Sequence, residues 1–152
     1  MKQNSSSPTD PNWQSPVTAE RISAGFRFAD LQWDNATGTL VWMEGRSSRN
    51  VLVCQPRGWG GRYDLTRQIG PRAQVGYGGG DFTVWNGTVY FVSGQTLYRQ
   101  PLASTDPVPL LERDREIASP AVSPDGRWIV LVTSTEQKDT VSIIQNESGA
   151  PI

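Results

Sequence analysis

A strand–turn–strand pattern runs through Ser119-Pro-Ala-Val-Ser-Pro-Asp-Gly-Arg-Trp-Ile-Val-Leu-Val-Thr133. Residues 124–126 favour a turn, because proline fixes φ, aspartate bonds to nearby backbone and glycine accepts a positive φ. Residues 128–132 are an unbroken run of β-forming side chains, which predicts a strand buried on both faces. The pattern therefore predicts a hairpin that lies between stacked sheets.

The same hairpin pattern occurs twice earlier in the chain. The first copy has predicted strands at 28–34 and 39–43, joined by the turn Asn35-Ala-Thr-Gly38. The second has strands at 81–85 and 88–92, joined by Asn86-Gly87, and this dipeptide is typical of tight hairpins. The chain is therefore expected to repeat one antiparallel unit.

Further strands follow each hairpin at a regular spacing. Third strands are predicted at 50–54, 96–99 and 140–144, and fourth strands at 63–66 and 108–111. Leu40, Val89 and Ile129 lie in the second strands, 49 and 40 residues apart. A four-stranded antiparallel unit that recurs every 40–50 residues or so is typical of β-propeller blades.

We therefore predict an all-β fold, a partial β-propeller with two complete four-stranded antiparallel blades plus most of a third. The propeller part is expected at 13–146, with blades at about 26–66, 81–111 and 117–146. Residues 1–12 are expected to form a disordered N-terminal tail and 147–152 a second tail. A β-sandwich also has many short strands, but the period is held in three registers, which favours the propeller. About four to eight blades close a ring, so the chain is expected to be part of a longer propeller.

Composition excludes several classes of function. The net charge of −1 over 152 residues gives no electrostatic basis for binding nucleic acid or an anionic membrane. No apolar run approaches the roughly 18 residues of a membrane span. With no histidine and one cysteine, the usual metal donors are missing, and we expect no metal, no cofactor and no catalytic residue. The polar N-terminus lacks a secretory signal, which favours the cytoplasm.

The glycine-rich stretch Val75-Gly-Tyr-Gly-Gly-Gly-Asp-Phe82 has three interpretations. Phosphate binding is disfavoured, because that mechanism needs a helix after the loop and a strand pattern follows instead. The glycines can let the backbone enter a crowded innermost strand. In the third interpretation, Tyr77, Gly78, Gly79 and Gly80 line the central channel of the propeller, where Tyr77 meets a ligand.

Three other groups of residues have a structural and a chemical interpretation. Cys54 lies in a strand pattern and is expected to be a small core residue rather than a reactive thiol. Tryptophans within predicted strands are expected to pack between blades rather than to form a sugar platform; they are Trp33, Trp42, Trp85 and Trp128. Trp59 lies in a turn and is expected to be exposed. Asp34 and Glu44 are the candidate carboxylate pair for glycoside hydrolysis.

An ordered set of motifs resembles one family of enzymes. The motifs are Ser15-Pro-Val-Thr-Ala-Glu20, Trp33-Asp34, Leu40-Val-Trp-Met-Glu-Gly-Arg46, Asn50-Val-Leu-Val53, Tyr77-Gly-Gly-Gly80 with Phe82, Val89-Tyr-Phe91 and Leu97-Tyr-Arg99. Together they resemble the N-terminal propeller of prolyl oligopeptidase-type serine peptidases, in particular the dipeptidyl aminopeptidase/acylaminoacyl peptidase branch. Ser123-Pro-Asp-Gly126 is similar to the repeat of TolB-like propellers.

The resemblance implies a function that this chain does not perform alone. In that family the propeller sits over a C-terminal α/β-hydrolase domain and admits only short or unstructured peptides. The chain has neither the histidine nor the Gly-x-Ser-x-Gly elbow of a Ser-His-Asp mechanism, so we expect no enzyme activity from it. The expected partners are a hydrolase domain or the remaining blades, and a peptide substrate.

Two alternatives to this function stay open. The first is a free-standing propeller-like interaction module, completed by self-association or by a partner protein. The second, a TolB-like periplasmic scaffold, would need a signal sequence, and none is seen, which disfavours it.

Overall fold

The structure, a computed structural model, describes residues 27–58, 60–73, 75 and 80–146. Within these residues all regular structure is β, in three antiparallel sheets. The first sheet contains β1 (Arg27–Asp34), β2 (Thr39–Arg46), β3 (Arg49–Gln55) and β4 (Tyr63–Asp64). The second contains β5 (Phe82–Trp85), β6 (Thr88–Ser93), β7 (Thr96–Pro101) and β8 (Val108–Glu112). The third contains β9 (Glu116–Val122), β10 (Trp128–Ser134) and β11 (Asp139–Gln145).

Each sheet is built from strands that follow one another in the chain. The strand orders are β1-β2-β3-β4, β5-β6-β7-β8 and β11-β10-β9. The prediction of an all-β fold is confirmed, and so are the three hairpins and the strands that follow them. Leu40, Val89 and Ile129 lie in β2, β6 and β10, the second strands of three separate sheets. The described part of the third sheet has three strands.

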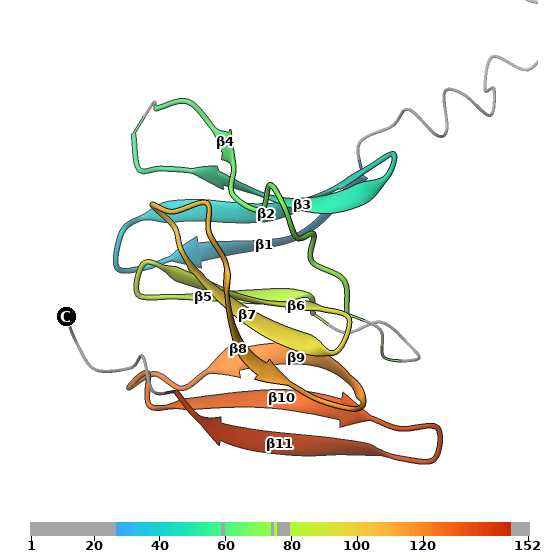
Figure 1. Cartoon of the computed structure of the whole chain (residues 1–152). Coiled ribbons are helices and arrows are strands. Elements are labelled where there is room, and N and C mark those ends of the chain that lie inside the picture. The colour runs from blue at the N-terminus through green and yellow to red at the C-terminus, as the bar shows by residue number, and fades with distance from the viewer. Residues whose placement is uncertain (1–26, 59, 74, 76–79, 147–152) are drawn as a thin grey trace, which may run out of the picture.

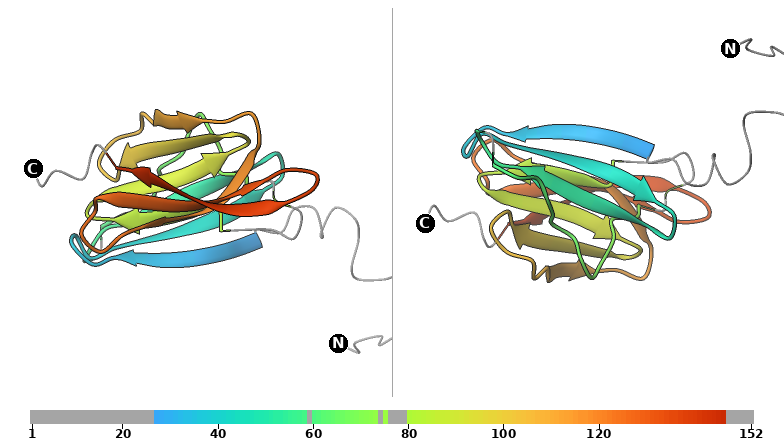
Figure 2. Two further views of the ribbon diagram at one scale, coloured as in Figure 1. Left: turned by 90° about the horizontal axis from the view of Figure 1, so that it is seen from below. Right: turned by 90° about the horizontal axis from the view of Figure 1, so that it is seen from above.

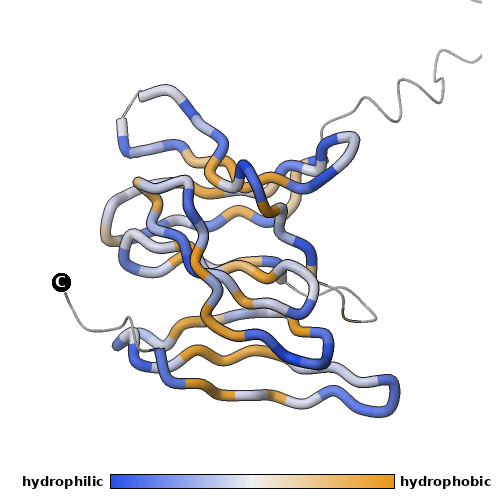
Figure 3. The backbone as a smooth tube through the Cα atoms, viewed as in Figure 1, coloured by the Kyte–Doolittle hydropathy of each residue, from blue (hydrophilic) through white to orange (hydrophobic). Residues whose placement is uncertain are grey.

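The sheets are layered in chain order, with the second between the other two (Figure 1). One apolar cluster joins the first sheet to the second through Val41, Leu52, Phe82, Val89, Phe91 and neighbours. Another joins the second sheet to the third through Tyr90, Val92, Leu97, Ile117, Ile129 and Leu131. Figure 3 shows apolar stretches along the strands of all three sheets and polar residues in most turns. The second sheet is therefore buried on both faces.

The first strands of neighbouring sheets contact each other, β1 with β5 and β5 with β9. Since β5 is an edge strand, its outer backbone groups need partners. The side chain of Gln32 on β1 supplies two of them. Its Nε2 donates to the carbonyl of Phe82 (2.9 Å) and its Oε1 accepts from the amide of Val84 (3.1 Å). This amide side chain therefore fixes the first sheet against the edge of the second.

The two outer faces of the stack carry exposed apolar side chains, and Figure 2 shows these faces from below and from above. On the first sheet Phe28, Leu31 and Trp33 form what we call the β1 end face, and both Leu31 and Trp33 are 64% exposed. On the third sheet Trp128, Val141 and Ile143 form the β11 end face, where Val141 is 70% exposed.

The β11 end face corrects one prediction. Residues 128–132 were expected to be buried on both faces, but along β10 burial alternates. Ile129 and Leu131 are buried against the second sheet, whereas Trp128 is exposed. The reason is that no further sheet covers the outer side of β10 within the described part of the chain.

Candidate binding site at the hairpin turns

A hollow of about 560 Å³ lies where the first hairpin turn of each sheet meets the others. Its lining comes from all three sheets: Trp33, Asp34, Asn35, Ala36, Val84, Trp85, Asn86, Pro124 and Asp125. Because each turn joins the first and second strands of its sheet, all three lie on the same side of the stack, at the ends of the strands (Figure 1). We call this feature the turn hollow.

The first two turns are joined by the carboxylate of Asp34, which is 1% exposed. Its Oδ2 accepts hydrogen bonds from the hydroxyl of Thr37 (2.6 Å) and from the amide of Gly87 (3.0 Å). Asn86 and Gly87 both have positive φ values, 48° and 75°, as a tight hairpin turn requires. These bonds hold the first two turns together, and the buried carboxylate of Asp34 is hardly accessible to a ligand.

The third turn is fixed by Asp125. Its Oδ1 accepts from the Ser123 hydroxyl (2.6 Å) and its Oδ2 from Nε of Arg127 (2.6 Å). These donors hold the pKa of Asp125 at about 2. Asp125 is therefore ionised at neutral pH and cannot donate a proton there.

The second and third turns are joined by packing and by a buried amide. Gly126 lies directly under the indole of Trp85. The Nδ2 of Asn146 donates to the Tyr90 hydroxyl (3.0 Å) and to the carbonyl of Gly126 (2.9 Å). The wall of the turn hollow is thus continuous across the second and third sheets.

The turn hollow offers groups that suit binding. Its two carboxylates, Asp34 and Asp125, already accept hydrogen bonds from neighbouring residues. The exposed ring of Trp33 can stack on an apolar or planar group, and the amides of Asn35 and Asn86 can both donate and accept hydrogen bonds. The sequence predicted the three turns but not that they lie together around one hollow. Each turn has the same position in its repeat, and this equivalence could have predicted that they are neighbours.

The candidate channel-lining residues fall mostly outside the described residues. Tyr77, Gly78 and Gly79 are not described. Gly80 is, and it does not line the turn hollow. It contacts the third sheet, where its carbonyl accepts from the amide of Ser119 (2.8 Å) and its amide donates to the Ser119 hydroxyl (3.1 Å). A channel role for these four residues stays a prediction.

The tryptophans divide into packed and exposed ones. Trp85 packs between the second and third sheets as predicted. Trp42 is buried with Val51 and Val53 on the outer side of the first sheet, not between sheets. The prediction is wrong for Trp33 and Trp128, which are exposed because they lie on the two end faces. Trp59 lies outside the described residues.

Asp34 and Glu44 do not form a carboxylate pair. Asp34 pairs with Thr39 at the start of β2, whereas Glu44 lies near its end. Side chains alternate between faces along a strand, so Glu44 shares the outer face with Trp42, whose Nε1 donates to it (3.0 Å). Among the described residues, no group of three His, Cys, Asp or Glu side chains could hold a metal ion.

Cys54 is buried in the cluster between the first and second sheets. Burial raises the pKa of its thiol to about 12, so little thiolate is present at neutral pH. We expect iodoacetamide at pH 8 to alkylate the folded protein about a thousandfold more slowly than the urea-unfolded chain. Mass spectrometry over time measures both rates, and similar rates would contradict the buried position. Because the folded pKa is the higher one, ionisation destabilises the fold only as the pH rises from about 8.5 toward 12.

Comparison with known proteins assigns no family to the chain, so any function has to be inferred from the fold and the sites described above. No protein-family model matches the chain, and no curated protein is similar to it in sequence. Within the described residues no helix has the length and hydropathy needed to cross a membrane.

Proposed function

We propose that this chain is the non-catalytic N-terminal propeller portion of a prolyl oligopeptidase-type serine peptidase. In this role it gates the access of peptides to an α/β-hydrolase domain that these 152 residues do not contain. The observation that carries the proposal is the stacking of three sheets in chain order, with an exposed apolar face at each end of the stack.

Chain order supports blades over a sandwich. Each described sheet is made of consecutive strands, and no strand crosses to another sheet. A β-sandwich with Greek-key connections passes strands back and forth between its two sheets, whereas a propeller completes one blade before it begins the next. In a closed ring of about four to eight blades, further blades would cover both end faces.

The turn hollow is consistent with a binding role in such a propeller. Polar groups and aromatic rings from three sheets line it, on one side of the stack. The amides of Asn35 and Asn86 suit an extended peptide, which presents backbone donors and acceptors. Since the chain has no histidine, the proton transfers of hydrolysis fall to the other domain.

A fluorophosphonate probe, which reacts with activated serines, tests this proposal. With the native gene product we expect the label on a serine outside residues 1–152. With the isolated chain we expect neither labelling nor hydrolysis of acyl-peptide or proline-containing substrates. Labelling or hydrolysis by the isolated chain would refute the proposal, and so would a native gene product that ends at Ile152.

A second candidate function is a free-standing interaction module that closes by self-association. The two exposed end faces favour it, because large apolar patches mark interaction surfaces. Two copies would bring six sheets together, within the range of about four to eight that closes a ring. Size-exclusion chromatography with light scattering would then give a stable dimer, and Ile143→Asp would give a folded monomer. A monomeric parent chain would argue against this function.

A further inference from the structure

A hollow of about 330 Å³ lies on the side of the stack opposite the turn hollow, at the other ends of the strands. It lies at the seam between the first and second sheets, beside the turn from β2 to β3. Its lining residues are Arg46, Ser48, Arg49, Asn50, Gly70, Pro71, Arg72 and Ser93. All the charged residues among them are arginines, and the rest of the polar ones are two serines and an asparagine. We call it the arginine hollow.

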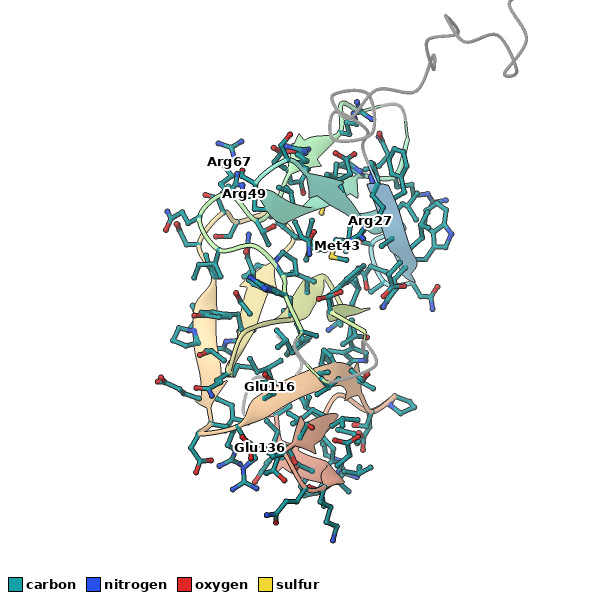
Figure 4. All side chains as sticks on the ribbon, turned by 90° about the vertical axis from the view of Figure 1, so that its right-hand side faces the viewer. Arg27, Met43, Arg49, Arg67, Glu116 and Glu136 are labelled. Carbon is teal, nitrogen blue, oxygen red and sulfur yellow. The ribbon has the colours of Figure 1, made fainter. Side chains whose placement is uncertain are left out.

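The three arginines differ in how far their guanidinium groups are occupied. Arg46 is held by Asp64 (2.7 Å) and Glu44 (2.9 Å), so its charge is largely neutralised. The Nη1 of Arg49 donates to the carbonyl of Arg67. Figure 4 shows these two residues side by side. The side chain of Arg72 is exposed and has no bonding partner in the described part of the chain. Arg49 and Arg72 therefore keep free N–H donors.

The backbone around the arginine hollow is fixed by bonds between the two sheets. The amide of Arg72 donates to the carbonyl of Val92 (2.7 Å), and the carbonyl of Arg72 accepts from the amide of Gly94 (3.0 Å). The Nδ2 of Asn50 donates to the carbonyl of Pro71 (3.0 Å). At Gly70 a side chain would press on the backbone carbonyl of Asn50, so only glycine permits this close approach. The backbone that carries Arg49 and Arg72 is therefore held in place in the absence of any ligand.

The next seam along the stack has the opposite charge. Between the second and third sheets a hollow of about 630 Å³ carries the carboxylates of Asp114, Glu116 and Glu136 beside Arg115. Figure 4 shows Arg49 and Arg67 in the upper part of the molecule and Glu116 and Glu136 in the lower part. Since the whole chain has a net charge of −1, any attraction for an anion must be local to the arginine hollow.

We propose that the arginine hollow binds an oxyanion, the carboxylate or phosphate group of a small ligand. Guanidinium groups hold both kinds of oxyanion through paired N–H donors, and the hydroxyls of Ser48 and Ser93 can donate further hydrogen bonds. The volume of the hollow leaves room for the rest of a small ligand beside its anionic group. This site does not depend on the proposed peptidase role, because its residues lie on the opposite side of the stack from the turn hollow.

Isothermal titration of the 152-residue chain with inorganic phosphate and with glutarate, in chloride at matched ionic strength, tests the site. We expect saturable binding of one or both. Saturation by phosphate alone identifies a phosphate-bearing ligand, and saturation by glutarate alone a carboxylate-bearing one. Arg72→Gln is expected to weaken binding about ten- to a hundredfold, and Arg49→Gln about tenfold, because each removes charge-assisted hydrogen bonds.

Arg62→Gln is the matched control, because Arg62 is an exposed arginine of the same part of the chain and does not line the hollow. It is expected to leave the affinity unchanged, and circular dichroism confirms that each variant is folded. Two results would overturn the proposal. One is no saturable binding of either anion; the other is an equal loss in Arg72→Gln and Arg62→Gln, which would indicate diffuse attraction only.

Discussion

Phe91→Ala is expected to lower the free energy of unfolding by about 3–5 kcal/mol. Phe91 is fully buried in the apolar cluster between the first and second sheets. Its ring also stacks on Tyr98, with centroids 5.3 Å apart. Truncation removes this packing and leaves a cavity that the strands on either side cannot close. Urea denaturation followed by tryptophan fluorescence measures the change.

Phe28→Ala is the matched control, since it makes the same truncation on the β1 end face, where the ring is 63% exposed. We expect it to cost less than about 1 kcal/mol. If Phe91→Ala costs no more than Phe28→Ala, the first two sheets do not pack as described. If instead Phe28→Ala also costs several kcal/mol, the β1 end face is covered in solution, and the self-association candidate gains support.

The hairpins could be predicted because their signals are local. Asn86-Gly87 and Ser123-Pro-Asp-Gly126 require particular backbone conformations, and the observed positive φ of 75° at Gly87 and 73° at Gly126 meet that requirement. The strands beside them are marked by runs of β-forming residues. The assembly of consecutive strands into one sheet follows, because neighbouring antiparallel strands joined by a short turn pair with each other.

The contacts between sheets could not be predicted, because they join residues that are far apart in the chain. Gln32 reads as an ordinary polar residue of a strand, yet its amide bonds to the backbone of β5. Arg49 and Arg72 belong to different segments, and nothing in their spacing brings them to one hollow. Such pairings depend on how the faces of two sheets fit together.

Burial at the ends of the stack also could not be predicted from local pattern. The run at 128–132 has the composition of a strand buried on both faces, but which faces are covered depends on the neighbouring layers. Trp33 and Trp128 are exposed for the same reason. Whether an apolar strand at the end of a stack is covered therefore depends on a neighbouring layer, and its own residues do not specify one.

Gly126→Ala is expected to lower the free energy of unfolding by about 2–4 kcal/mol. Gly126 has a φ of 73°, and an alanine in this left-handed region costs about 1 kcal/mol. In addition, its Cβ would overlap the indole ring of Trp85, and relieving such an overlap costs about 1–3 kcal/mol. Chemical denaturation of the variant measures the sum.

Gly94→Ala separates the two causes. Gly94 also has a positive φ, 62°, but a Cβ there would meet no atom within 4 Å, so we expect this variant to lose only about 1 kcal/mol. Combining Gly126→Ala with Trp85→Ala removes the overlap, and the double variant is then expected to be more stable than the sum of the two single changes implies. Equal costs for Gly94→Ala and Gly126→Ala, with strict additivity in the double variant, would show that Trp85 does not lie on the third turn. The junction between the second and third sheets, and the wall that it gives the turn hollow, depend on that contact.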